Sequence, residues 1–445
     1  MTNILNLSRY HVISKKEGDH DYHIDTETIN PSKSCLACGS ENIVGGGRQE
    51  ILITDLPMHG KRVGVYVQAR RFRCRDCGKT ITERLPDDAE GQRMTNRLHK
   101  WIGEQSITKT FTSIANEVGI SEGLVRLIFK EYVASIESTV LFETPEWMGI
   151  DEIHIIKKPR CVITDIEHCT VIDLLPNRDK PLIVNYMMRL PNRHNVKCVT
   201  MDMWKPYKDA VYATMPQAFI VIDKFHVLRM ANAALEVIRK GVRADLTAKQ
   251  RRGLMHDRFL LLKRDNNLQN LDRLTLESWT RNYPALGEAY RAKEGFFEFY
   301  EAMSIPEAKY LYSEWQNNLS PSIQSAFKPL TTAMKNWDEE IFKYFDCPVT
   351  NAYTESLNSL IRVVNRCGRG YSFEALRAKI LFTSGAHKIV RPKFQRQPQT
   401  DRYETELGLG AAPLHPMRTT EMLQQPKNYG VDLSTLLKLI EKGTL

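Results

Sequence analysis

Length, composition and charge limit the kinds of protein this chain can be. With 445 residues it is too long for one compact core, so we expect two to four domains. No run reaches the roughly 18 apolar residues of a membrane span, and the N-terminus lacks the apolar core and cleavage site of a secretory signal. We therefore expect a cytoplasmic protein with reduced cysteines and no membrane partner. The formal net charge of +9 favours a polyanionic partner, although many basic proteins never bind nucleic acid.

Paired cysteines mark the first region, residues 1–90, where short apolar alternations predict small strands. Cys35 and Cys38 form one CxxC pair, and Cys74 and Cys77 form another. Each pair bends the backbone so that two thiolates point at one ion, and two pairs make a closed tetrahedral site. We expect structural Zn²⁺, which would stabilise a glycine-rich segment with little apolar matter to bury. Four incidental thiols or a redox pair is the alternative.

Residues 91–140 have the pattern of a helix-turn-helix. Gly119 supplies permissive backbone at the turn, and Ser121 can cap the second helix. The exposed face of that helix would carry Arg126 and Lys130 toward the major groove of DNA. An ordinary helical hairpin is the alternative. The zinc module before it and the basic balance favour DNA binding.

Residues 145–226 alternate strands and helices, and three of the aspartates on the predicted strands are candidate metal ligands. Asp151 lies inside an apolar run, where a carboxylate is costly to bury unless it is paired or binds a metal. Asp202 ends the fourth strand, and Asp223 lies on the fifth. The predicted element order is that of a ribonuclease-H-like fold: three strands, a helix, a strand, a helix and a strand.

The first and fourth strands of such a fold are neighbours, so Asp151 and Asp202 would lie about 4.8 Å apart in backbone terms. Asp223 would lie about two strand spacings from Asp151, too far for two ions about 4 Å apart. Position therefore favours Asp202 over Asp223 as a metal ligand.

A helix packed against the strand ends must supply a third carboxylate, and Glu355 lies near the start of one. Asn351 or Thr354 could cap this helix. Its buried face could be formed by Leu357, Leu360 and Ile361. On its own, a glutamate in a first turn usually just compensates the helix dipole.

The rest of the chain contains a long helical stretch and a basic segment. Residues 227–348 are helical and charged, with no convincing strand, and residues 399–445 look loosely ordered. Arg366 and Arg369, flanked by glycine and tyrosine, suit phosphate clamping and base stacking, with a solvated charged loop as the alternative. Basic residues continue along the segment that contains them: Arg366, Arg369, Arg377, Lys379, Lys388, Arg391, Lys393, Arg396 and Arg402.

Four motifs together resemble the bacterial insertion-sequence transposases of the ISL-three family. They are Gly149-Ile-Asp-Glu, Asp202-Met-Trp-Lys-Pro-Tyr, Ile222-Asp-Lys-Phe-His-Val and Thr354-Glu-Ser-Leu-Asn. The resemblance covers nearly the whole chain and implies a multidomain α/β protein. Its parts would be a zinc ribbon, a helix-turn-helix and a ribonuclease-H-like DDE catalytic domain interrupted by an all-α insertion. Residues 227–348 would be that insertion, and residues 349–398 would complete the catalytic domain.

The resemblance implies that Asp151, Asp202 and Glu355 are the catalytic triad. Asp223 and His226 match a further family motif. A structural hydrogen bond at the start of the insertion and a DNA-contacting or active-site-supporting role are equally open for this pair. The triad would hold two Mg²⁺ (or Mn²⁺) ions for metal-dependent cleavage and transfer of DNA strands.

The implied partners are the terminal inverted repeats of the element and its target DNA. We expect them to be bound by a homodimer or larger synaptic complex in the nucleoid. Two rival functions are a non-catalytic DNA-binding regulator, which would lose a carboxylate, and a ribonuclease-H-like repair nuclease, which would act on DNA structure rather than sequence.

Overall fold

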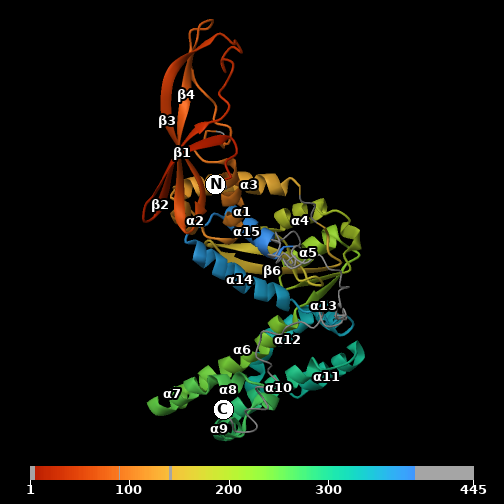
Figure 1. The fold of residues 1–445 in the computed structure, drawn as a ribbon. Coiled ribbons are helices and arrows are strands. Elements are labelled where there is room, and N and C mark those ends of the chain that lie inside the picture. The colour runs from red at the N-terminus through yellow and green to blue at the C-terminus, as the bar shows by residue number, and fades with distance from the viewer. Residues whose placement is uncertain (1–5, 90, 140–142, 386–445) are drawn as a thin grey trace, which may run out of the picture. The chain divides into compact units, whose positions relative to one another are not determined.

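The computed structural model describes residues 6–89, 91–139 and 143–385 (Figure 1). The predicted tail at 399–445 lies outside the described residues, as do five of the basic residues: Lys388, Arg391, Lys393, Arg396 and Arg402. Within the described ranges, every helix is too short or too polar to cross a membrane.

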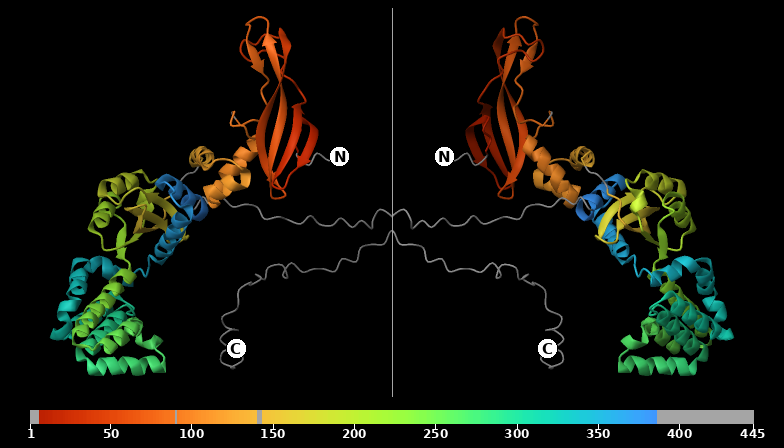
Figure 2. Two further views of the ribbon diagram at one scale, coloured as in Figure 1. Left: turned by 90° about the vertical axis from the view of Figure 1, so that its left-hand side faces the viewer. Right: turned by 90° about the vertical axis from the view of Figure 1, so that its right-hand side faces the viewer.

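The N-terminal region is a five-stranded sheet with its own apolar core. Its strands are β1 (Tyr10–Glu17), β2 (Asp21–Thr28), β3 (Ile43–Met58), β4 (Lys61–Cys74) and β5 (Thr80–Thr82), in the order β1-β2-β4-β3 with β5 on β4. The expected small strands are instead a long hairpin, because β3 and β4 have 16 and 14 residues and stay paired side by side (Figure 2). Alternate residues of β4, including Val63, Val65 and Val67, are buried with Ile24 and Ile53. The expectation that this region has little to bury was therefore wrong.

Three helices follow: α1 (Asn96–Thr108), α2 (Phe111–Val118) and α3 (Glu122–Glu137). A hydroxyl caps each N-terminus by accepting a backbone N–H bond, and Ser121 does so for α3, as predicted. Gly119 has φ of +83°, the left-handed backbone that the tight turn between α2 and α3 requires. Val125 and Ile128 of α3 are buried. The predicted arrangement of two helices and a turn is confirmed.

A second five-stranded sheet forms the centre of the next region. Its strands are β6 (Trp147–Ile155), β7 (Lys158–Asp165), β8 (Thr170–Leu175), β9 (Cys198–Met201) and β10 (Phe219–Ile222), in the order β10-β9-β6-β7-β8. The first three strands are antiparallel, whereas β9 and β10 run parallel to β6. The helices α4 (Lys180–Arg189) and α5 (Lys205–Thr214) make the two crossovers. The predicted element order and the pairing of the first and fourth strands are confirmed.

Only helices and short 3₁₀ turns are found between β10 and residue 348. The helices are α6 (Lys224–Val242), α7 (Ala248–His256), α8 (Arg258–Leu262), α9 (Asn270–Asn282), α10 (Pro284–Phe299), α11 (Ile305–Asn317), α12 (Pro321–Asn336) and α13 (Asp338–Phe342). Their core residues, among them Leu235, Phe299 and Phe327, belong to one apolar cluster with Ile150 and Met201 of the central sheet.

Two further helices, α14 (Ala352–Gly368) and α15 (Phe373–Ser384), complete the region. Leu357 and Ile361 of α14 are buried, as predicted, but Leu360 is 44% exposed. Successive residues of an α-helix are rotated by about 100° around its axis. The middle of the buried face of α14 lies between the directions of Thr354 and Leu357, and the Leu360 side chain points about 110° away from it. Apolar residues of α14 and α15 share a second core with α1, α2 and α3.

Candidate active site and metal centres

Acidic side chains from β6, from the ends of β9 and β10, and from α14 meet around His226. Ligand atoms of Asp151, Asp202 and His226 all lie within 4.8 Å of one another, and so do those of Asp223, His226 and Glu355. His226 Nε2 is 2.9 Å from Asp202 Oδ1 and 3.3 Å from Glu355 Oε1. The structure therefore brings the three predicted carboxylates together, with an imidazole between two of them.

Strand pairing explains why Asp151 and Asp202 are neighbours. The last pair between β6 and β9 joins Ile150 to Met201, so each aspartate is the next residue along its strand. Asp151 is buried, at 5% exposure, and Asp202 is partly exposed. Because side chains at paired positions of neighbouring strands point to the same face, both carboxylates lie on one face of the sheet.

Asp223 lies beside two members of this group, His226 and Glu355. It directly follows β10 and caps α6, where its carboxylate accepts a bond from the Phe225 N–H at 3.3 Å. Strand spacing separates it from Asp151, but the start of α14 packs on the same face of the sheet and places Glu355 beside Asp223. The sequence predicted only the separation of Asp223 from Asp151, and its closeness to Glu355 was not predicted.

The start of α14 is held on the sheet by buried polar contacts. Asn351 Nδ2 donates to the carbonyl of Ile150 at 3.3 Å, and the hydroxyls of Thr354 and Thr164 are 2.7 Å apart. A Cβ atom on Gly149 would lie 2.7 Å from Asn351 Oδ1 and 2.8 Å from Thr354 Oγ1, so only glycine allows the start of α14 to approach β6 this closely. Asn351, rather than Thr354, occupies the predicted N-cap position of α14, but its side chain makes no cap bond.

Asn358 orients Asp151, a function that the sequence reasoning missed. Its Nδ2 donates to Asp151 Oδ2 at 2.6 Å, while the Glu152 N–H donates to Asp151 Oδ1 at 2.6 Å. Asn358 closes the motif that contains Glu355, and it is only 3% exposed. The available signal was the spacing of Asn351, Thr354 and Asn358, which places three polar residues on the buried face of one helix.

The crowded carboxylates have perturbed pKa values. Burial and then the charge of Asp202 raise the pKa of Asp151 to about 7. Burial also raises the pKa of Asp223 and, together with the charge of Asp223, that of Glu355. Burial alone would lower the pKa of His226, but its bond to Asp202 outweighs this and raises the pKa. Acidic groups that repel one another in this way favour a cation.

The donor set fits a hard divalent cation. Carboxylate oxygens are the ligands that Mg²⁺ prefers. Two oxygens in this group, Asp223 Oδ2 and Asn358 Oδ1, are buried without a hydrogen-bond partner among the described residues, and such atoms are rare unless water or an ion satisfies them.

A cavity of about 780 Å³ opens onto these carboxylates between α6 and α14. Arg229 of α6 and Arg362 of α14 line it beside Asp151, Asp202 and Glu355. Cations next to a carboxylate cluster suit a polyanionic substrate such as a phosphodiester.

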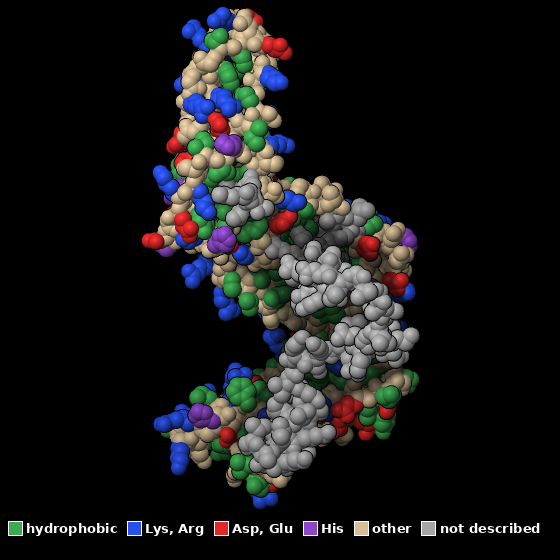
Figure 3. All heavy atoms as spheres, viewed as in Figure 1, with side chains coloured by type: hydrophobic (Ala, Val, Ile, Leu, Met, Phe, Trp, Pro, Cys, Tyr) green, Lys and Arg blue, Asp and Glu red, His purple; other side chains and the backbone are tan. Residues whose placement is uncertain are grey.

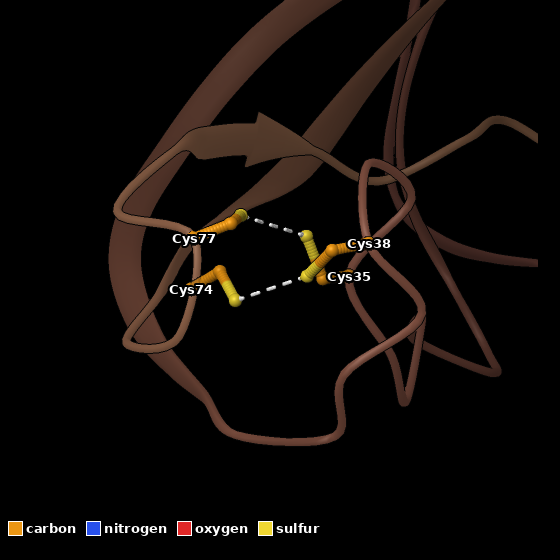
Figure 4. A group of neighbouring side chains, drawn as sticks. All are labelled: Cys35, Cys38, Cys74 and Cys77. Carbon is orange, nitrogen blue, oxygen red and sulfur yellow. Dashed lines mark hydrogen bonds between the residues drawn. The ribbon is translucent and has the colours of Figure 1, made fainter.

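Four sulfur atoms form a separate group at one end of the N-terminal hairpin (Figure 4). Cys35 Sγ is 3.7 Å from Cys77 Sγ, and Cys38 Sγ is 3.6 Å from Cys74 Sγ. Thiolates about 2.3 Å from a tetrahedral ion lie about 3.8 Å apart, so the predicted zinc site has the right dimensions.

The two cysteine turns have the same backbone conformation. Gly39 and Gly78 have φ of +77° and +70°, and their N–H groups donate to the carbonyls of Cys35 and Cys74 at 2.8 and 3.1 Å. Backbone N–H groups also favour the thiolate and lower the pKa of Cys74 to about 7. These features suit thiolate ligands.

The predicted DNA-contacting residues differ in their solvent exposure and in whether other side chains already pair with them. Lys130 is exposed, and so are Arg366 and Arg369 at the end of α14. Arg126 is only partly exposed, because it pairs with Glu122 at 2.5 Å and stacks on Phe111 at 4.9 Å.

Two basic residues of the predicted polyanion-binding segment are instead structural. Arg377 donates to Asp173 at 2.7 Å and to Glu137 of α3 at 2.8 Å. Lys379 is 2% exposed and donates to the carbonyl of Lys109, just after α1, at 2.8 Å. Both side chains therefore connect α15 to the helix-turn-helix.

Three family descriptions match consecutive parts of the chain. The zinc-finger of transposases IS204/IS1001/IS1096/IS1165 matches residues 31–77, and the helix-turn-helix domain of transposase family ISL3 matches residues 83–133. The transposase domain of the same family matches residues 148–380, which is more than half of the chain.

Curated relatives agree with these matches. The transposase for insertion sequence element IS1001 of Bordetella parapertussis is 25% identical over 329 residues, covering 72% of this chain and 80% of that protein. The transposase for insertion sequence element IS1557 of Mycobacterium tuberculosis, in strains CDC 1551 / Oshkosh and ATCC 25618 / H37Rv, is 24% identical over 366 residues, covering 76% of this chain and 82% of the relative. The chain belongs to the ISL3 family of insertion-sequence transposases.

Proposed function

We propose that this chain is a DDE transposase that cleaves DNA at the ends of its insertion sequence and joins them to a target. The observation that carries the proposal is the convergence of Asp151, Asp202 and Glu355 beside a cavity that also presents Arg229 and Arg362. A regulator that only binds DNA would need neither the carboxylates nor the cavity.

The catalytic domain is proposed to be ribonuclease-H-like. The order β10-β9-β6-β7-β8, with three antiparallel strands followed by two parallel ones, supports this assignment. We assign residues 145–226 and 349–398 to it, residues 227–348 to the helical insertion, and residues 399–445 to a tail.

We propose Asp151, Asp202 and Glu355 as ligands of two Mg²⁺ (or Mn²⁺) ions. When bound, these ions would supply positive charge for activating water or a DNA 3′-hydroxyl and for stabilising the leaving 3′-oxygen.

The residues around the triad position its members. Asn358 fixes one oxygen of Asp151, and Asp223 caps α6 so that His226 faces Asp202 and Glu355. In-line phosphoryl transfer depends mainly on such positioning and on electrostatic stabilisation. Arg229 and Arg362 would bind phosphate oxygens of the DNA strand in the cavity.

DNA recognition is proposed for the two N-terminal modules. Residues 1–90 would form a zinc ribbon with structural Zn²⁺ on its four cysteines, and residues 91–140 would place Arg126 and Lys130 on the terminal repeats. Arg366 and Arg369 would add phosphate contacts. Pairing of two element ends implies a homodimer or larger complex, acting on DNA in the nucleoid.

The test is strand cleavage of a duplex carrying the element's own end, with Mg²⁺ or with EDTA. We expect cleavage only with Mg²⁺, and its loss in Asp202→Asn. Asp223→Asn should retain activity, because asparagine also caps helices well. Metal-dependent cleavage that survives Asp202→Asn would refute the triad. Equal cleavage of unrelated branched DNA would favour a repair nuclease, and binding without cleavage would favour a regulator.

A further inference from the structure

A group of basic residues lies on the helical insertion, away from the residues so far assigned to DNA. From Lys240 to Arg258 the sequence has six lysines and arginines against two aspartates. Lysine and arginine side chains gather at the left-hand end of the lower part of the molecule, over α7 (Figure 3). The basic arm is defined here by its exposed members: Lys240, Arg243, Lys249, Arg251 and Arg252.

Most of this charge is not used within the fold. Arg258 pairs with Glu236 at 3.1 Å, and Arg251 donates to the carbonyl of Leu246 at 2.9 Å. Within the described part of the chain, the side chains of Lys240, Arg243 and Arg252 have no ion-pair or hydrogen-bond partner. Like charges held close together without partners repel one another, so they favour a polyanion.

The helix α6 connects this arm to the candidate active site. Its exposed residues recur at helical spacing, from Arg229 and Ala233 through Val237 to Lys240. The first two line the cavity beside the carboxylates, and Lys240 belongs to the arm. One continuous solvent-facing stripe therefore runs from the cavity to the arm.

The dimensions of the stripe match a DNA backbone. At 1.5 Å per residue, Arg229 and Lys240 are about 16 Å apart along α6, which corresponds to about 5 base pairs of B-DNA. Between them the stripe carries the small residue Ala233 and no acidic residue, so a phosphate backbone could lie close to the helix.

We propose that the basic arm binds the phosphate backbone of duplex DNA, independently of sequence, about 5 or more base pairs from the phosphate held in the cavity. The inference rests on the proposed function, because it takes the cavity as the position of the cleaved strand. The insertion thereby contributes a DNA-binding surface in addition to the zinc ribbon and helix-turn-helix.

The first experiment measures binding of the full chain to a random-sequence 30-base-pair duplex over a salt series. The test variant combines Lys240→Gln, Arg243→Gln and Arg252→Gln. Three lost phosphate contacts should reduce the slope of log affinity against log salt by about 2.7. A matched control removes the same charge from α11 and α12 of the insertion, through Lys309→Gln, Lys328→Gln and Lys335→Gln, and should keep the wild-type slope.

The second experiment locates the contact by hydroxyl-radical footprinting on a duplex that carries the element end and flanking DNA. The test variant should lose protection beginning about 5 base pairs from the cleavage position, while protection over the terminal repeat remains. Equal slopes in test and control variants, or an unchanged footprint, would overturn the proposal. A change of association state in sedimentation would also overturn it, because the arm would then be a protein interface. Random-sequence binding requires no cleavage, so failure of the proposed chemistry would show separately, as a wild-type chain inactive with Mg²⁺.

Discussion

Replacement of Gly149 by alanine tests whether close packing of α14 on β6 positions Glu355. The added Cβ would lie 2.4 Å from Thr164 Oγ1, 2.7 Å from Asn351 Oδ1 and 2.8 Å from Thr354 Oγ1. Non-bonded contacts to a carbon atom are favourable from a separation of about 3.5 Å, so these three oxygen atoms would have to move away by about 0.7–1 Å. Overpacking of this kind costs about 1–3 kcal/mol. A displacement of about 1 Å at a reacting group can cost about 100-fold in rate.

We therefore expect Gly149→Ala to lower the thermal unfolding midpoint and to slow Mg²⁺-dependent strand cleavage by about 100-fold. Both are measured on the full chain, with cleavage followed at saturating DNA and metal. Gly241→Ala is the matched control, since its Cβ meets no atom within 4 Å. Adding Thr164→Ala to Gly149→Ala removes the nearest oxygen and should restore part of the stability. Reduced stability with wild-type cleavage would refute the connection between this packing and Glu355.

Three further predictions follow from named contacts. Asn358→Ala should raise the Mg²⁺ concentration for half-maximal cleavage by about 10–100-fold, because Asp151 loses the amide that orients it. The control Ser359→Ala, on the same cavity wall, should leave that concentration unchanged, and an unchanged metal requirement in Asn358→Ala would contradict this role. Arg377→Gln should lower the free energy of unfolding by about 3–5 kcal/mol, because Asp173 becomes a buried charge without its ion-pair partner. The measurement is a urea titration, and an unchanged unfolding midpoint would contradict this prediction. Metal analysis should find one Zn²⁺ per chain and none in Cys74→Ser. Circular dichroism should show the rest of the chain still folded, since its two apolar cores are separate from that of the N-terminal sheet; global unfolding of that variant would contradict this expectation.

Much of the site could be predicted because its signals are local. The cysteine turns are set by short spacing, and Asp202 marks the end of an apolar strand. The pairing of the first and fourth strands then follows from element order alone. Cap and turn residues such as Ser121 and Gly119 likewise act within a few positions.

The remaining features depend on long-range packing. The closeness of Asp223 to Glu355 was not predicted, because it depends on how α14 crosses the sheet. Arg377 and Lys379 have the same composition signal as DNA-facing residues, and only the folded structure shows that they are internal. Asn358 is separated from Asp151 by more than 200 positions, so no local pattern joins them.

The apolar core that α15 shares with α1, α2 and α3 limits how this protein can be divided. Phe111 and Phe129 lie in the same cluster as Tyr371 and Leu376, although the catalytic region separates them in sequence. Removing the first 140 residues would expose the apolar side of α15 to water, and the remaining fragment should aggregate rather than act as an isolated nuclease. Chimeras between relatives should therefore exchange α15 together with the helix-turn-helix. The helix-turn-helix and α15 form one packing unit, although they lie far apart in the sequence.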